Sequence, residues 1–152
     1  MVRPAHRRVS RVILLDENDN FLLLLTASPN LQTPVIRWIT PGGGVEDHET
    51  HAEGAVRELF EETGLRVDSV GDPVWTFEGT SVFNDGHVQS TYSEYFVHRT
   101  TAFEPITDHW MENEFVDITG VKWWSLEELL SSGEKFSPDP LPEIVARAIS
   151  LT

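Results

Sequence analysis

The order of the predicted elements places the sequence in the α/β class, as a mixed β-sheet covered by helices on both faces. Three observations predict this class. Runs of β-forming residues recur along the chain, a capped amphipathic helix follows the third run, and two further helical segments come near the end. At 152 residues the chain has the size of one domain, and we expect a single domain over residues 1–152.

Seven runs of β-forming residues predict the strands. The polar run Asp16–Asn20 separates the first two and predicts a hairpin turn, and Asn84-Asp85-Gly86 predicts another turn. The segment from Leu22 to Leu25 is apolar without alternation, which is typical of a strand buried on both faces. The predicted strands are Val9–Leu15, Phe21–Thr26, Ile36–Thr40, Arg66–Val70, Val74–Glu78, Val88–His98 and Val121–Trp124.

The first helix is predicted between Thr50 and Gly64. Thr50 and Glu53 form a T-x-x-E capping box, which marks the beginning of a helix, and Gly64 supplies the C-terminal stop. One stripe of this helix is apolar or small, and we expect it to pack on the core. The stripe consists of Ala52, Ala55, Val56, Leu59 and Thr63.

Two shorter helices are expected near the end of the sequence. One follows the strand that ends at Trp124 and runs from a Ser125-x-x-Glu128 capping pattern through Leu130. The other runs from about Pro142, a residue suited to a first helical turn, to Ile149. Strands that alternate with these helices predict a sheet between helical layers.

Three glutamates dominate the opposite face of the first helix. Glu58, Glu61 and Glu62 are spaced i, i+3, i+4, and this spacing puts them on one face within about one turn. Three carboxylates so close together repel each other, and a divalent cation would offset the repulsion because hard cations such as Mg²⁺ prefer oxygen ligands. We therefore expect the helix to present these carboxylates outward, toward solvent and a metal ion.

A glycine-rich segment precedes the helix. Pro41-Gly42-Gly43-Gly44 allows a backbone turn that other residues would resist, and it exposes carbonyls that can bind a metal. Arg57 is expected to pair with Glu49 and so to fix this loop against the helix, pointing away from the metal-binding carboxylates. Gly54 lies near the acidic face at a cost of about 1 kcal/mol relative to alanine. It would leave room for a close approach by the substrate.

The segment from Gly43 to Leu65 resembles the signature of the Nudix hydrolase family at every fixed position. It reads Gly43, five residues, Glu49, seven residues, and then Arg57-Glu58-Leu59-x-Glu61-Glu62-x-Gly64-Leu65. The resemblance implies a Nudix-type α/β/α sandwich with a mixed central sheet. The later run VKWWSLEEL also looks like the strand-then-helix ending that many family members share.

The resemblance also implies an activity, namely metal-dependent hydrolysis of a phosphoanhydride bond in a nucleoside diphosphate linked to another moiety. Mg²⁺ or Mn²⁺ is the implied cofactor, and Glu58 is our choice for the carboxylate that deprotonates the attacking water, with Arg57 and Glu61 as further catalytic residues. The implied metal ligands are Gly42, Gly43, Glu58, Glu61, Glu62 and, from the loop before the last strand, Glu114.

A non-hydrolytic nucleotide-binding sensor on the same fold is the alternative. Such proteins typically lose a carboxylate of the signature, and this chain keeps all of them. An isomerase of prenyl diphosphates would need a catalytic cysteine, and the sequence has none. The sequence leaves the identity of the nucleoside diphosphate derivative open.

Several side chains outside the signature are candidates for substrate contact. Arg37 and Trp38 lie just before the glycines, and we expect both, with Gly54, to contact the substrate. Trp110 is expected to cover the site from its loop. Three aromatic residues on later strands could stack on a nucleobase, but we expect them to belong to the core. They are Trp75, Phe77 and Phe83.

The formal net charge of −14 bears on the partners. A field of that sign repels nucleic acid and membrane surfaces, so we expect a small nucleoside diphosphate derivative as the partner and neither nucleic acid nor membrane. Four arginines near the N-terminus are either a basic tail or part of the phosphate site; these are Arg3, Arg7, Arg8 and Arg11. The lack of cysteine fits a cytoplasmic protein. A homodimer is left open.

Overall fold

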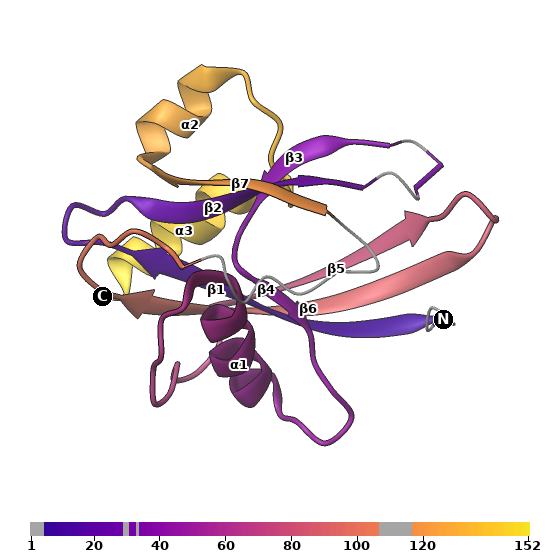
Figure 1. Cartoon of the computed structure of the whole chain (residues 1–152), viewed down its shortest axis with the longest axis horizontal. Coiled ribbons are helices and arrows are strands. Elements are labelled where there is room, and N and C mark those ends of the chain that lie inside the picture. The colour runs from indigo at the N-terminus through magenta and orange to yellow at the C-terminus, as the bar shows by residue number, and fades with distance from the viewer. Residues whose placement is uncertain (1–4, 29–30, 33, 107–116) are drawn as a thin grey trace.

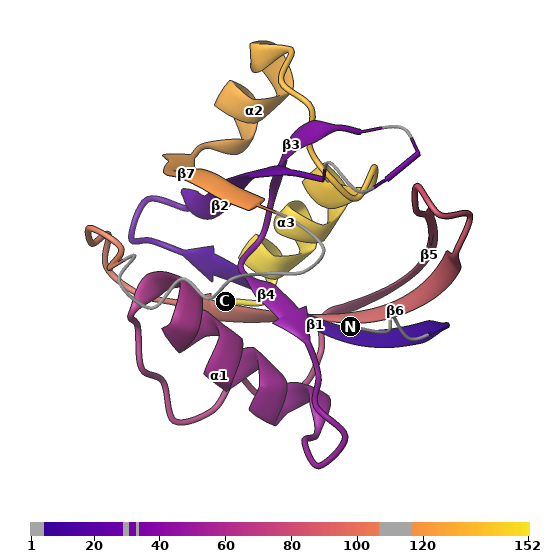
Figure 2. The same ribbon diagram turned by 45° about the vertical axis from the view of Figure 1, so that its right-hand side comes forward.

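The computed structural model describes residues 5–28, 31–32, 34–106 and 117–152. A mixed, curled sheet carries one helix on one face and two on the other (Figure 1), and the layers separate clearly in the turned view (Figure 2). The strands are β1 (His6–Leu15), β2 (Phe21–Ala27), β3 (Ile36–Ile39), β4 (Gly42–Gly44), β5 (Trp75–Val82), β6 (Val88–Arg99) and β7 (Asp117–Trp124). The helices are α1 (His51–Thr63), α2 (Leu126–Ser132) and α3 (Leu141–Ser150).

The sheet follows the order β3-β2-β1-β6-β5, with β4 paired to β1 and β7 paired to β2. β1 and β6 run parallel, and the other pairs are antiparallel. β1 and β2 are in register at Leu15 and Phe21, next to the turn that joins them. Beyond this point the half with β2, β3 and β7 spreads away from the half with β1, β5 and β6 (Figure 1). The site described below lies where the two halves diverge.

Alternation along β1 divides the core into two layers. Val12 and Leu14 belong to the cluster under α1, whereas Ile13 and Leu15 belong to the cluster under α2 and α3. All four side chains are buried, as expected for a central strand covered on both faces. The predicted α/β/α sandwich with a mixed central sheet is therefore confirmed.

The signals at the ends of the helices are confirmed as well. Thr50 and Glu53 form the reciprocal capping box of α1, and Gly64 ends that helix in the left-handed conformation at φ 82°. Ser125 caps α2, and Pro142 lies in the first turn of α3. No described helix combines the length and the apolar character that a membrane-crossing helix needs.

The prediction of a strand over Arg66–Val70 was wrong. This segment has no strand and connects α1 to β5. Its apolar residues, Val67 and Val70, pack into the cluster under α1, so they are buried by a helix rather than by a neighbouring strand. An apolar pattern in a short segment predicts burial, but it does not say which element covers it.

The glycine segment, predicted as a turn, instead forms the short strand β4 against β1. Gly42, Gly43 and Gly44 pair with Arg11, Ser10 and Val9. Gly42 has φ 150°, and a Cβ at this position would clash with the Ser10 carbonyl. Only glycine allows the two backbones to approach so closely here, and this explains why a segment of such weak strand propensity forms a strand.

Candidate active site

Glu62 is the most deeply buried carboxylate of the signature. It is 6% exposed, and its Oε1 accepts a hydrogen bond of 2.6 Å from the Gly42 N–H. Burial, followed by the nearby charge of Glu58, raises the pKa of Glu62 to about 8, against the lowering effect of Arg11. The prediction that all three glutamates face solvent is therefore wrong for Glu62, because β4 lies over this face of the helix.

Glu58 lies against the same strand. A Cβ on Gly43 would approach the Glu58 Oε1 to 2.5 Å, so the carboxylate occupies the space that the glycine leaves open. The Glu58 side chain is 16% exposed. Burial is the largest cause that raises the pKa of Glu58, while Arg57 and Arg11 lower it. Such a carboxylate is a stronger base than an exposed one, and a nearby cation would stabilise its ionised form.

The peptide groups of β4 alternate between the two sides of the strand. The hydrogen bonds that flank the β1–β4 ladder place Gly43 in a bonded pair with β1. The backbone N–H and carbonyl groups of Gly42 and Gly44 therefore face away from β1. The Gly42 N–H donates to Glu62, and the Gly44 carbonyl accepts a hydrogen bond of 2.9 Å from Arg57 Nη2. The Gly42 carbonyl shares this helix-facing side, whereas the Gly43 carbonyl faces β1.

Arg57 connects the loop before α1 to the glycine strand. Its Nε and Nη2 donate to the two oxygens of Glu49 at 2.7 and 2.9 Å, a bidentate pair. These hydrogen bonds lower the pKa of Glu49 and raise that of Arg57. Arg57 thus spans Glu49 and Gly44 and can hold the loop and β4 in a fixed relation to α1.

The same guanidinium also reaches the acidic face, which corrects the expectation that it points away. Arg57 Nη1 donates to Glu58 Oε1 at 3.1 Å and to Glu61 Oε2 at 3.2 Å. The Glu61 side chain is 30% exposed and is the most open of the three carboxylates. The arginine offsets part of the mutual repulsion of the glutamates, and a metal ion would compete with it for the same oxygens.

The donor set suits a hard divalent cation. Glu62 contacts the helix-facing N–H of Gly42, and Glu58 lies against Gly43. Burial disfavours the ionised form of both carboxylates, and a divalent cation would offset this cost. A second group of oxygens and a nitrogen, from Glu46, His48 and Glu49, lies within 4.8 Å of one another in the loop. Since Glu49 is already bound by Arg57 and the other two are exposed, we regard the helix face as the better site.

Gly54 does not lie open to a substrate. It is buried in α1, and a Cβ there would meet Val45 at 3.2 Å and Glu49 at 3.4 Å. The close approach that this glycine allows is therefore made by the chain's own loop between β4 and α1. Gly54 therefore allows that loop to pack against α1, and it does not line a substrate pocket.

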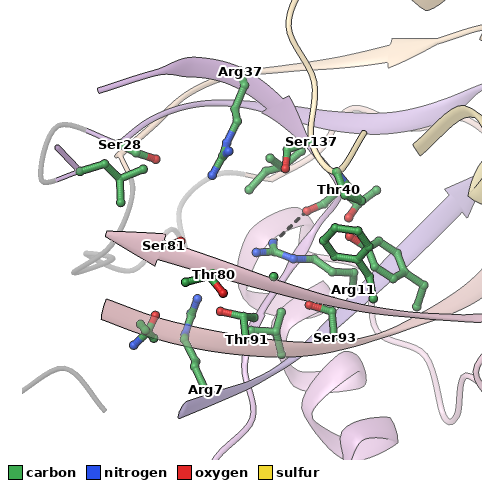
Figure 3. Close-up of a pocket in the computed structure, with 18 of the residues that line it drawn as sticks. Arg7, Arg11, Ser28, Arg37, Thr40, Thr80, Ser81, Thr91, Ser93 and Ser137 are labelled. Atoms are coloured by element: carbon green, nitrogen blue, oxygen red, sulfur yellow. Dashed lines mark hydrogen bonds between the residues drawn. The ribbon is translucent and has the colours of Figure 1, made fainter. Parts of the chain in front are cut away.

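A pocket of about 200 Å³ opens on the other side of β4, between the diverging halves of the sheet (Figure 3). The side chains of Arg7 and Arg11 from β1 and Arg37 from β3 enter it from opposite walls. Arg11 Nη1 donates to the Thr40 carbonyl at 3.2 Å. Hydroxyl groups line much of the rest, from Ser28, Thr40, Thr80, Ser81, Thr91, Ser93 and Ser137.

The structure separates the two neighbouring substrate candidates. Arg37 lines the pocket, and its pKa is lowered first by burial and then by the charge of Arg11. Trp38 points the other way because side chains alternate along β3. It is 8% exposed and packs edge-on against Trp124 at 5.1 Å, in the core under α2 and α3. As expected, Phe83 is buried and Phe77 packs against the core, and both also line the pocket.

Arg7 and Arg11 are the pocket residues that sequence patterns left undecided. The sequence placed them in a group that was either a basic tail or part of the phosphate site. Their spacing, i and i+4 on one strand, was a usable signal, because it puts both on the same face of β1. Glu114 and Trp110 lie outside the described residues, so their predicted roles stay predictions.

Comparisons with known proteins identify similar sequences and structures. A mouse oxidized purine nucleoside triphosphate hydrolase is 39% identical over 80 residues, which cover 50% of this chain and 49% of that protein. The chain thus spans about half the length of that relative. The MutT protein of Methanosarcina mazei Go1 superimposes with a TM-score of 0.68 at 22% identity, over 99% of this chain and 98% of that one.

A further structure shows the same fold with a bound nucleotide. The NUDIX domain of Shewanella oneidensis NrtR, solved in complex with ADP ribose, gives a TM-score of 0.64 at 18% identity and covers 99% of this chain and 91% of that chain. The family model of the NUDIX domain matches residues 5–144. Together with the glycine strand, the capped helix and the glutamates, this match over most of the sequence shows that the chain belongs to the NUDIX domain family.

Proposed function

We propose that the protein is a metal-dependent hydrolase that cleaves a phosphoanhydride bond in a nucleoside diphosphate linked to another moiety. The observation that carries this proposal is the pair of partly buried Glu58 and buried Glu62, which lie between α1 and the glycine strand and have raised pKa values. Buried carboxylates with no direct catalytic use would be costly, and their position beside a peptide carbonyl suits a site for a cation and a phosphate.

Mg²⁺ or Mn²⁺ would be held by Glu58, Glu61 and Glu62, with the carbonyl of Gly42. We prefer Gly42 to Gly43 for this role because its peptide group faces the helix. When bound, the cation would supply positive charge to the phosphate oxygens. Glu114 stays the proposed distal ligand from the loop before β7.

The chain's own groups would perform the proton transfer. The oxygen of a water molecule attacks phosphorus, the anhydride P–O bond breaks, and the proton of the water passes to the Glu58 carboxylate. The burial that raises the pKa of Glu58 makes it a better base. Arg57 would position Glu58 and the glycine strand through its contacts to Glu49 and Gly44. Glu61 would share the charge of the cation.

The pocket beyond β4 supports a small, phosphate-containing substrate. In a chain of net charge −14, three arginines in one pocket would draw an anion that the rest of the surface repels. The same surface charge argues against nucleic acid or a membrane as the partner. The single domain over residues 1–152, the cytoplasmic location and the homodimer stay predictions.

A screen of phosphoanhydrides tests the proposal. Nucleoside di- and triphosphates, nucleotide sugars, ADP-ribose and dinucleoside polyphosphates would be incubated with the protein, with Mg²⁺, with Mn²⁺ and with excess EDTA. We expect turnover of at least one diphosphate derivative that stops in EDTA and returns with metal. Binding of these compounds without any turnover would favour the nucleotide sensor instead.

A further inference from the structure

The charge balance of the arginine pocket differs sharply from that of the chain. Arg7, Arg11 and Arg37 line it, and no Asp, Glu or Lys stands among its described lining residues, so its formal charge is +3. The whole chain has 11 basic and 25 acidic residues. In such a chain, a pocket lined by three arginines and by no described acidic side chain would attract an anion that comes from outside.

Buried polar atoms without partners gather in the same pocket. Among the described residues, Arg37 Nε, Ser28 Oγ and Thr40 Oγ1 are each buried without a hydrogen-bond partner. All three residues line the pocket (Figure 3). Unsatisfied buried groups are costly and rare in folded proteins, so three around one cavity point to a ligand that accepts hydrogen bonds.

The glycine strand separates this pocket from the carboxylates. A Cβ on Gly44 would meet Arg7 Nη2 at 3.4 Å, and one on Gly42 would meet the Arg11 side chain, whereas one on Gly43 would meet Glu58. The arginines thus lie against one face of β4 and Glu58 lies against the other. A group bound by Arg37, Ser28 and Thr40 is for this reason different from the diphosphate proposed to lie at the carboxylates.

We propose that the pocket binds a phosphate monoester that the substrate carries in addition to the diphosphate that is cleaved. The proposal rests on the proposed function and narrows its substrate class to diphosphate derivatives with a third, separate phosphate. A phosphate monoester brings a charge of about −1.5 to −2 and three acceptor oxygens at neutral pH. It satisfies several arginine and hydroxyl donors at once, whereas one carboxylate would offset a single charge.

Matched pairs of nucleotides that differ by one phosphate test this inference. NADPH and NADH form one pair, and coenzyme A and 3′-dephospho-coenzyme A form another. Their affinities would be measured by isothermal titration calorimetry in EDTA, so that no turnover interferes. The proteins compared are the wild type, Arg37→Gln, and the control Arg66→Gln, which removes the same charge from an exposed position outside the pocket.

We expect the wild type to bind the phosphorylated member of at least one pair about tenfold more tightly, the size of one charge-assisted interaction. Arg37→Gln should bring this ratio close to one, and Arg66→Gln should keep it. Equal affinities within both pairs, binding of neither pair, or an unchanged ratio in Arg37→Gln would overturn the proposal. Those results would leave metal-dependent hydrolysis of other phosphoanhydrides standing, whereas phosphate discrimination without any turnover would overturn the hydrolase function alone.

Discussion

The two faces of the glycine strand hold opposite charges and satisfy them differently. On the helix side, Glu62 accepts a hydrogen bond from the Gly42 N–H, Glu58 accepts one from Arg57, and the charge of Glu58 raises the pKa of Glu62. On the pocket side, Arg37 makes no ion pair with any described carboxylate. Arg11 lines the pocket, and its charge also lowers the pKa values of both glutamates.

The comparison shows how one short segment can separate a cation site from an anion site. Glycine has no side chain, so carboxylates and guanidinium groups approach the β4 backbone from opposite faces. The helix side gathers carboxylates, and the pocket side gathers arginines. The helix side is suited to a cation and the pocket side to an anion, so a metal-bound diphosphate that carries a separate phosphate would suit both sides.

Removing the charge of the carboxylates on the helix side of β4 should have the largest effect on kcat. Glu58→Gln and Glu62→Gln keep the shape of the side chain and remove the charge, and each should lower kcat by about 10²- to 10³-fold because the electrostatic stabilisation of the transition state is lost. Steady-state kinetics on a substrate from the screen would measure this. Glu127→Gln, on the exposed face of α2, is the control and should retain full activity. If both site variants turn over the substrate at the wild-type rate, Glu58 and Glu62 do not belong to the active site.

Adding a methyl group to β4 should affect the two faces differently. Gly43→Ala places a Cβ 2.5 Å from Glu58 Oε1 and forces the carboxylate to move, which should lower kcat by about 10²-fold. Gly44→Ala is the matched variant, since its Cβ meets Arg7 at an ordinary 3.4 Å. It should change KM more than kcat. A similar fall in kcat for both variants would contradict the division of the site along this strand.

Loosening the connection between loop and helix should have a smaller effect. Arg57→Lys keeps the charge but loses the bidentate contact to Glu49, and we expect kcat to fall about tenfold with little change in KM. Glu49→Gln should cause a similar loss. In the double variant the two losses should not add, because both remove one interaction. Additive losses in this cycle would show that Arg57 and Glu49 act separately.

The stability of the metal-free protein should depend on pH because the Glu62 carboxyl group titrates. The pKa of Glu62 in the folded state, about 8, lies above its ordinary value of 4.5, so the folded state binds the proton more tightly. This contribution to stability is fully present below the ordinary pKa and is lost as the pH rises through about 8. In EDTA, the melting temperature should fall by a few degrees between about pH 6 and pH 9.

Glu62→Gln provides the comparison for this measurement. It cannot ionise, so its melting temperature should change less over the same range and should exceed that of the wild type at the alkaline end. Mg²⁺ should stabilise the wild type most at high pH, where the carboxylate of Glu62 is ionised and can bind a cation. Parallel pH profiles for the two proteins would show that Glu62 is not held in a destabilising environment.

Local signals in the sequence predicted the local parts of the site. The capping box and the terminal glycine predicted where α1 begins and ends, and the i, i+3, i+4 spacing correctly grouped the glutamates on one face. Spacing alone could not show which glutamate is covered. The burial of Glu62 depends on β4, and β4 forms only because the glycines pair with β1, more than thirty residues earlier. Propensity argues against a strand there, so the pairing was missed.

The pocket could not be predicted for a similar reason. Arg7 and Arg11 are close in sequence to each other but distant from Arg37, and only the divergence of the two halves of the sheet brings the three together. Residues that are adjacent in sequence need not share a site. Trp38 follows Arg37 directly, yet Trp38 faces the core and Arg37 faces the pocket. The fold class depends on repeated patterns and was predictable, whereas the partners of single side chains depend on long-range pairing.

The position of a bound metal ion tests the central claim most directly. Crystals of the protein grown with Mn²⁺ would show the ion through its anomalous scattering. The account predicts a peak within direct coordination distance of the Glu58 and Glu62 carboxylates and the Gly42 carbonyl. A peak at Glu46, His48 and Glu49, with the helix side of β4 empty at saturating Mn²⁺, would contradict it.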